Sequence, residues 1–182
     1  MKKNKGYTLV EMIIVIGIMA VLSAVTFVTL YIIKLGKRNA AVHTFENQIS
    51  NCLVKTKALS DMESTSKGAL CMLVQFDTAK NRYVISLANH SGLTYTSIAG
   101  TETELPEEVG TIVYVESPAN QKATDTTVDN TNMVIQFVKS DGSVKYGGGT
   151  YYFYSRGIEP NDTSSSFATI TLDAMTGNHL SQ

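Results

Sequence analysis

The chain has 182 residues, with 15 basic and 16 acidic side chains and a formal net charge of −1. This balance argues against general electrostatic binding of nucleic acid. Hydrophobic residues make up 43% of the sequence. They are concentrated at the N-terminus, whereas the remainder is rich in Thr, Ser, Asn and Gly, which is typical of a β-rich extracytoplasmic domain rather than a cytosolic enzyme. Beyond the first ~35 residues, the chain fits one domain of ordinary size.

The N-terminal apolar run extends from Thr8 to Ile33 and contains a single charged residue, Glu11. It exceeds the roughly 20 residues that a helix needs to cross a bilayer. A cleavable secretory signal would have a shorter apolar core and a small-residue cleavage site at its end. Because Lys2, Lys3 and Lys5 precede the run, we expect the N-terminus to stay cytoplasmic and the rest of the chain to be exported.

Glu11 has two interpretations at this stage. Thr8 and Glu11 have the spacing of a capping box, in which the two side chains bind the first free N–H groups of a helix. A carboxylate also suits the positive end of a helix dipole. Alternatively, a charge within an apolar run is costly in lipid and awaits a partner. The residues alone leave both alternatives open.

The segment Lys5-Gly6 followed by Tyr-Thr-Leu-Val-Glu-Met and a long apolar run resembles the class III signal of type IV prepilins and pseudopilins. The resemblance implies that a prepilin peptidase cuts between Gly6 and Tyr7 and methylates the new amine of Tyr7. It also implies that Glu11 neutralises the N-terminal ammonium of a neighbouring filament subunit. Pairing lowers the cost that each charge would carry alone in a medium of low dielectric constant.

The helical pattern continues beyond the membrane-length run. A stripe of mainly apolar residues recurs at spacings of three and four, with polar residues between its members. The stripe consists of Val42, Phe45, Ile49, Cys52, Leu53, Thr56 and Leu59. This predicts one helix from Tyr7 to about Leu59 whose second half is amphipathic. A break near Gly36 into two helices is the alternative.

The period changes after Gly68, and short strands are predicted from there to the C-terminus. Alternating and β-branched residues separated by turn residues predict hairpins and further strands, within 70–76, 82–87, 93–98, 110–116, 133–138, 144 onward, 150–154 and 167–172. The polar stretch 117–132 is predicted to be a surface loop, and it is the place where we expect subunit or ligand contacts. The predicted fold class is α+β: a long N-terminal helix packed on a C-terminal antiparallel β-domain. The predicted boundaries are a leader at 1–6, a transmembrane and assembly helix at 7–35, an amphipathic continuation at 36–60 and an extracytoplasmic β-rich domain at 61–182.

Two further segments, IQFVKSDGSV and ATITLDAMTGNHL, are similar to the C-terminal pattern of H-type minor pseudopilins. There, a strand with Phe, an Asp-Gly turn and a closing Thr-Gly turn recur. The resemblance implies a minor subunit.

The remaining residues offer little chemistry. Cys52 and Cys71 form a possible disulfide, which would add ~3 kcal/mol of stability, or they are two buried free thiols. His43, His90 and His179 have no metal-ligand spacing, so no metal and no cofactor are expected. Tyr151, Tyr152 and Tyr154 alternate and are expected to lie half in the core and half on the surface, with a contact patch as the alternative. The sequence contains no catalytic constellation, and we expect no enzymatic activity.

The sequence therefore predicts a structural subunit, resembling a minor pilin or pseudopilin, of a type IV pilus, competence pilus or type II secretion-like filament. The resemblance implies several partners: other pilin or pseudopilin subunits, the prepilin peptidase, membrane lipid and, indirectly, an inner-membrane platform protein and an assembly ATPase. We expect a single-pass membrane protein with its C-terminal domain outside the cytoplasm, which later enters an envelope or extracellular filament. The alternative is a monomeric, membrane-tethered extracytoplasmic binding domain.

Overall fold

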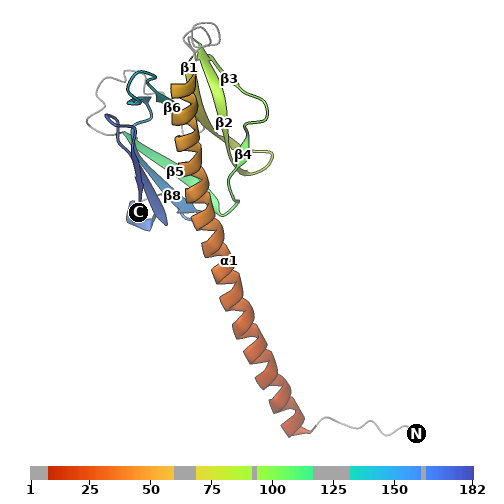
Figure 1. Cartoon of the computed structure of the whole chain (residues 1–182). Coiled ribbons are helices and arrows are strands. Elements are labelled where there is room, and N and C mark those ends of the chain that lie inside the picture. The colour runs from red at the N-terminus through yellow and green to blue at the C-terminus, as the bar shows by residue number, and fades with distance from the viewer. Residues whose placement is uncertain (1–7, 60–68, 92–93, 117–131, 161–162) are drawn as a thin grey trace. The chain divides into compact units, whose positions relative to one another are not determined.

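The computed structural model describes residues 8–59, 69–91, 94–116, 132–160 and 163–182 (Figure 1). The chain divides into two compact units, Met1–Lys37 and Arg38–Gln182. One helix, α1 (Leu9–Ala58), contributes to both units. The prediction of a single long helix that begins near residue 8 and ends near residue 59 is confirmed, and no break occurs at Gly36.

The described residues of the second unit form two antiparallel sheets. The first sheet has the strand order β3-β2-β1-β6-β7, and β4 pairs with β2 outside this path. Its strands are β1 (Ala69–Asp77), β2 (Arg82–Ser91), β3 (Thr94–Ser97), β4 (Thr103–Glu104), β6 (Asn132–Phe137) and β7 (Val144–Tyr146).

The second sheet has the order β10-β9-β8-β5. Its strands are β5 (Val109–Glu116), β8 (Gly149–Ser155), β9 (Ala168–Leu172) and β10 (His179–Ser181). A short 3₁₀ helix, η2 (Thr163–Ser165), precedes β9. The α+β fold class, a long N-terminal helix packed on antiparallel β-structure, is confirmed.

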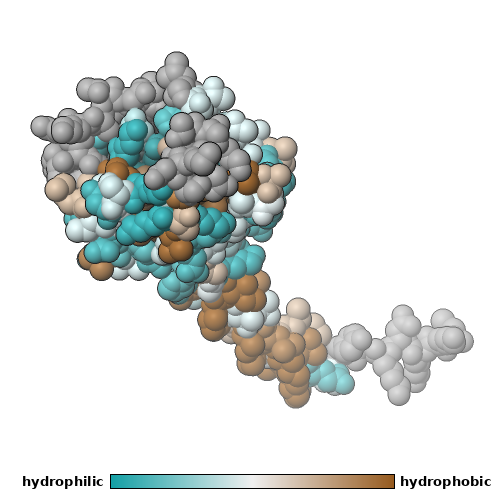
Figure 2. Space-filling model, turned by 45° about the horizontal axis from the view of Figure 1, so that its top comes forward, coloured by the Kyte–Doolittle hydropathy of each residue, from teal (hydrophilic) through white to brown (hydrophobic). Residues whose placement is uncertain are grey.

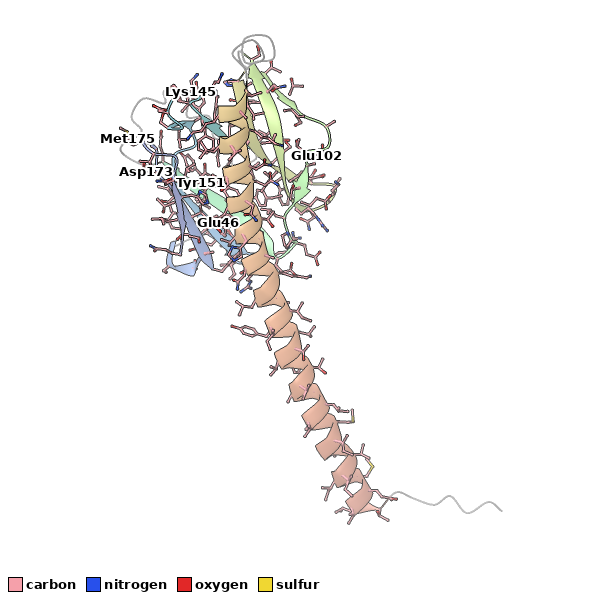
Figure 3. All side chains as sticks on the ribbon, viewed as in Figure 1. Glu46, Glu102, Lys145, Tyr151, Asp173 and Met175 are labelled. Carbon is pink, nitrogen blue, oxygen red and sulfur yellow. The ribbon has the colours of Figure 1, made fainter. Side chains whose placement is uncertain are left out.

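The last third of α1 packs on both sheets because its apolar stripe is buried between them (Figure 1). Phe45 lies at the centre of this contact: its ring centroid is 5.3 Å from that of Tyr151 and 5.2 Å from that of Phe153, both on β8. Figure 3 labels Tyr151 beside the helix. The buried positions of α1 match the predicted stripe, namely Ala41, Val42, Phe45, Ile49, Cys52 and Thr56.

Strand β1 has two differently packed faces, as the alternation of side chains along a strand requires. Leu70, Met72 and Val74 belong to the main core, together with the buried residues of α1. Cys71 and Leu73 belong to a second, smaller cluster with Ala88 of β2. The two faces explain why nearly every residue in the first half of β1 is buried.

Candidate processing and assembly segment

The first turn of α1 contains the charged residue that interrupts the apolar run. The Glu11 side chain accepts hydrogen bonds through Oε2 from the backbone N–H of Thr8 (2.8 Å) and from the Thr8 hydroxyl (3.0 Å). In return, the backbone N–H of Glu11 donates to the Thr8 hydroxyl oxygen at 3.2 Å. These reciprocal contacts are a capping box. Of the two interpretations of Glu11, the capping role is therefore present within the single chain.

Every side chain from residue 8 to residue 37 is exposed. In this part of α1 the hydrophobic side chains surround the whole helix, and Figure 2 shows them as a brown surface. Among the described residues, α1 is the one helix that is long and apolar enough to cross a membrane by length and composition. An all-apolar helix surface of this kind requires a non-aqueous environment or other helices to cover it.

Three hydroxyl groups in this segment are satisfied within the helix itself. Ser23, Thr26 and Thr29 each donate to the carbonyl oxygen four residues earlier, at 2.7, 2.9 and 2.9 Å respectively. Backbone and side-chain polar groups that bond internally carry no large penalty in hydrocarbon. The segment is therefore compatible with lipid from residue 12 to residue 33, between the Glu11 carboxylate and Lys34.

The comparisons with known proteins concern this same segment. Residues 1–27 match the family described as the prokaryotic N-terminal methylation motif. No curated protein and no solved structure matches the chain.

A long N-terminal helix packed on antiparallel sheets defines an α+β pilin-like fold. The matched motif is the class III prepilin signal, which occurs in type IV pilins and pseudopilins. This signal indicates processing by a prepilin peptidase, and together with the apolar helix it is consistent with membrane anchoring before assembly. The H-type subclass is not part of this finding.

Two of the predicted site residues, Gly6 and Tyr7, lie outside the described residues, as does nearly all of the predicted contact loop 117–132. Glu11 is described and lies in the capping box. The role of Gly6 and Tyr7 as the cleavage site therefore rests on the sequence signal.

The two cysteines lie at different places in the core. Cys52 faces the main core from α1, whereas Cys71 lies on the opposite face of β1 and donates through Sγ to the carbonyl oxygen of Ala88 at 3.3 Å. Both are free and buried. Burial raises the pKa of the Cys52 thiol to about 12, with a smaller contribution from Cys71, and burial raises the pKa of Cys71 to about 12 as well.

The tyrosines of β8 lie mainly in the core. Tyr151 and Tyr154 are buried, and Tyr152 is half-buried. Burial raises the pKa of Tyr151 well above its usual value, and its hydroxyl donates to the carbonyl oxygen of Gly147 at 2.5 Å. Tyr151 is therefore a core residue with its polar end satisfied.

Sequence reasoning missed the contacts that join distant turns. The turn after β6 and the turn after β9 lie together, and the backbone N–H of Val144 donates to the carbonyl oxygen of Ala174 at 2.9 Å. Arg156 was also missed, although it binds two backbone carbonyl groups from separate loops. The Asp-Gly and Thr-Gly pairs signalled the turns, but no local pattern signalled their partners.

Among the described residues, no cluster of three or more His, Cys, Asp or Glu side chains is placed to hold a metal ion.

Proposed function

We propose that this chain is a structural subunit of a type IV pilin-like filament. The prepilin peptidase would cleave between Gly6 and Tyr7 and methylate the amine of Tyr7. The observation that carries the proposal is the methylation motif at residues 1–27 at the start of a helix that is apolar on all sides. In this proposal the chain acts by assembly and performs no chemistry of its own.

The apolar part of α1 would pack against the equivalent helices of other pilin or pseudopilin subunits. All its side chains from residue 8 to residue 37 are exposed in the single chain, so leaving the bilayer requires a protein surface that replaces lipid. The helices of neighbouring subunits offer such a surface. Assembly would further involve the inner-membrane platform protein and, indirectly, the assembly ATPase.

Glu11 would have two successive partners in this scheme. In the unprocessed chain its Oε2 atom receives both hydrogen bonds from Thr8. After cleavage, a free ammonium group is present at Tyr7, and the carboxylate of a neighbouring subunit would neutralise it. A charge pair in hydrocarbon is far less costly than two isolated charges, so this pairing would select one axial register between subunits.

The finer assignment is to a minor subunit of a pilus, a competence pilus or a type II secretion-like filament. The two turns behind the H-type resemblance lie side by side in the fold. This arrangement supports a shared C-terminal architecture and does not distinguish among the three filament systems.

The test is the chemical identity of the mature N-terminus. Intact-mass and N-terminal peptide mass spectrometry on the chain purified from its native membrane is expected to find N-methyl-tyrosine, corresponding to Tyr7, as the first residue. A variant with Gly6→Val is the matched control and should retain Met1 and the leader. An intact leader on the native chain, with the protein dispersed as a monomer, would instead support the second candidate, a membrane-tethered binding domain.

A further inference from the structure

A small cavity lies where the two sheets meet, at the end of the β1–β2 hairpin. Its volume is about 190 Å³. Three strand-end segments contribute its lining: the hairpin with Phe76 and Asn81, the start of β5 with Gly110 and Thr111, and the segment after β8, residues 156–160. All of these residues belong to the second compact unit.

Arg156 places a fixed positive charge in this cavity. Its Nε–H donates to the carbonyl oxygen of Glu107 at 2.7 Å, and its Nη2 donates to the carbonyl oxygen of Asn81. These two bonds use one edge of the planar guanidinium group. The second N–H of Nη2 and one N–H of Nη1 point in parallel from the end of the group, and such a pair of donors can bind a carboxylate with two hydrogen bonds.

The positive charge of Arg156 is not neutralised within the described part of the chain. Its contacts there are the two carbonyl oxygens, and it forms no ion pair with a described carboxylate. Glu159 also lines the cavity but lies outside ion-pairing distance of Arg156. Among the described residues, the cavity therefore presents a cation that two hydrogen bonds hold in orientation and whose end N–H groups have no acceptor.

The backbone around Arg156 brings the cavity walls close together. A Cβ atom at Gly110 would stand within 2.5–2.9 Å of the backbone of Ser155 and Arg156. Only glycine allows β5 to approach β8 this closely, at the point where the β5–β8 register shifts. Phe76, Ile158 and Pro160 add apolar wall beside the charged edge.

The size and polarity of the cavity restrict what it can hold. Sites for cofactors and drug-sized ligands are usually about 300–1,000 Å³, so this cavity accommodates a single side chain rather than a nucleotide. The positive charge selects an anion, and the apolar wall suits a ligand whose anionic group ends a hydrocarbon stem. We propose that this cavity, which we call the Arg156 cavity, docks the carboxylate side chain of an acidic residue from a partner polypeptide.

The proposal does not depend on the proposed function, because any protein partner with an exposed Glu or Asp has the required chemistry. Glu159 provides a second, independent test of the proposal. Its carboxylate lines the same cavity and opposes an incoming carboxylate, so its removal should strengthen binding. An exposed charge interaction of this kind contributes about 0.2–1 kcal/mol, which corresponds to roughly a 1.4- to fivefold change in Kd.

The experiment uses the full chain in detergent micelles, labelled with ¹⁵N, and N-acetyl-glutamate amide as the probe. The titration is expected to shift the backbone amide signals of Gly110, Thr111 and Gly157. N-acetyl-glutamine amide is the neutral control and should leave these signals in place. The Glu159→Gln chain should bind the glutamate probe more tightly, and Arg156→Gln should lose the response.

Arg156 also holds two loops, so Arg156→Gln is interpreted only if its amide spectrum remains that of the folded chain. If that variant unfolds, the comparison between the two probes and the Glu159→Gln titration decide the question. Equal shifts with both probes, or unchanged affinity in Glu159→Gln, would overturn the proposal. Inorganic phosphate that binds as tightly as the glutamate probe would also overturn it, because the site would then be a general anion site.

Discussion

Gly177 lies directly against the carbonyl oxygen of Gly142, so that no side chain fits between the two turns. Gly177 closes the turn after β9 with φ = 70°, and Gly142 closes the turn after β6 with φ = 83°. One turn belongs to each sheet. The contact therefore joins the sheets at their ends, in addition to the core that they share with α1.

Gly177→Ala should destabilise the chain more than the same change at a glycine with a similar backbone conformation and open surroundings. Gly100 is the matched control: its φ is 80°, and a Cβ there would meet no atom within 4 Å. Both substitutions carry a left-handed backbone cost of about 1–2 kcal/mol. Gly177→Ala adds a steric cost of about 1–3 kcal/mol. Urea unfolding followed by tyrosine fluorescence measures both variants, and equal losses would contradict the contact.

Asp173 makes the stability of the same turn depend on pH. The Oδ1 atom of Asp173 accepts three hydrogen bonds. The donors are the backbone N–H of Thr176 at 2.8 Å, the Thr176 hydroxyl at 2.9 Å and the backbone N–H of Met175 at 2.9 Å. These bonds, that from the Thr176 backbone first, lower the pKa of Asp173.

A lowered carboxyl pKa contributes stability above the unfolded value of about 3.9, and this contribution is lost as pH falls through the folded pKa. Asp173→Asn retains an acceptor oxygen but cannot titrate. We expect its free energy of unfolding to fall less steeply than that of the native chain between about pH 4 and pH 2. Parallel pH profiles for the two proteins would show that the turn does not hold Asp173 in its charged form.

The local pattern of the sequence predicted the elements well because each signal is carried by neighbouring residues. The stripe through Phe45 and Ile49 predicted the buried face of α1, and the alternation around Tyr83 and Ile85 predicted β2. Strand β4, with only two residues, was missed because so short a segment has no period to detect.

The arrangement of those elements was not predictable in the same way. Met72 of β1 pairs with Leu87 of β2 through a short hairpin, but also with Ile135 of β6, which lies 63 positions along the chain. Local periodicity does not encode such a pairing. The contacts of Arg156 with Asn81 and Glu107 were not predictable either, because Arg156 meets these separate loops only in the folded domain.

Phe45→Ala tests the contact between α1 and the second sheet. Phe45 is fully buried and packs on Tyr151 and Phe153, so its loss should cost about 3–5 kcal/mol of unfolding free energy. Val54→Ala on the same helix is the control, because Val54 is 64% exposed and should change stability by about 0.5 kcal/mol or less. Near-UV circular dichroism during urea unfolding gives both values. A small effect at Phe45 would mean that the helix does not rely on this contact.

The state of the two cysteines is measurable by alkylation without a reducing agent. Their raised pKa values, about 12 for each, leave almost no thiolate at pH 8, and burial blocks access. We expect the folded chain to react slowly with iodoacetamide and the unfolded chain to gain two labels by mass. A Cys52–Cys71 disulfide would instead give no label until reduction. Forming it requires Cys71 to reach the opposite face of β1.

Substitutions of Glu11 and Thr8 distinguish the capping role of the first turn from the proposed charge pairing between subunits. Glu11→Gln keeps a side chain that serves in a capping box but removes the charge that would pair with the ammonium at Tyr7. Thr8→Val removes the hydroxyl that donates to Glu11 at 3.0 Å and accepts from its N–H at 3.2 Å, and it leaves the charge in place. Loss of a cap costs about 0.5–2 kcal/mol of helix stability, which the rest of a 50-residue helix absorbs.

We therefore expect Glu11→Gln to insert into the membrane normally and to be depleted from sheared filament fractions, whereas Thr8→Val should assemble close to the native level. Immunoblots of membrane and filament fractions measure both quantities, and the native chain provides the reference. The opposite pattern, with Thr8→Val depleted and Glu11→Gln incorporated, would assign the geometry of the first turn to capping alone. Equal incorporation of all three chains would remove the charge pairing from the mechanism, because the carboxylate would then have no partner on which assembly depends.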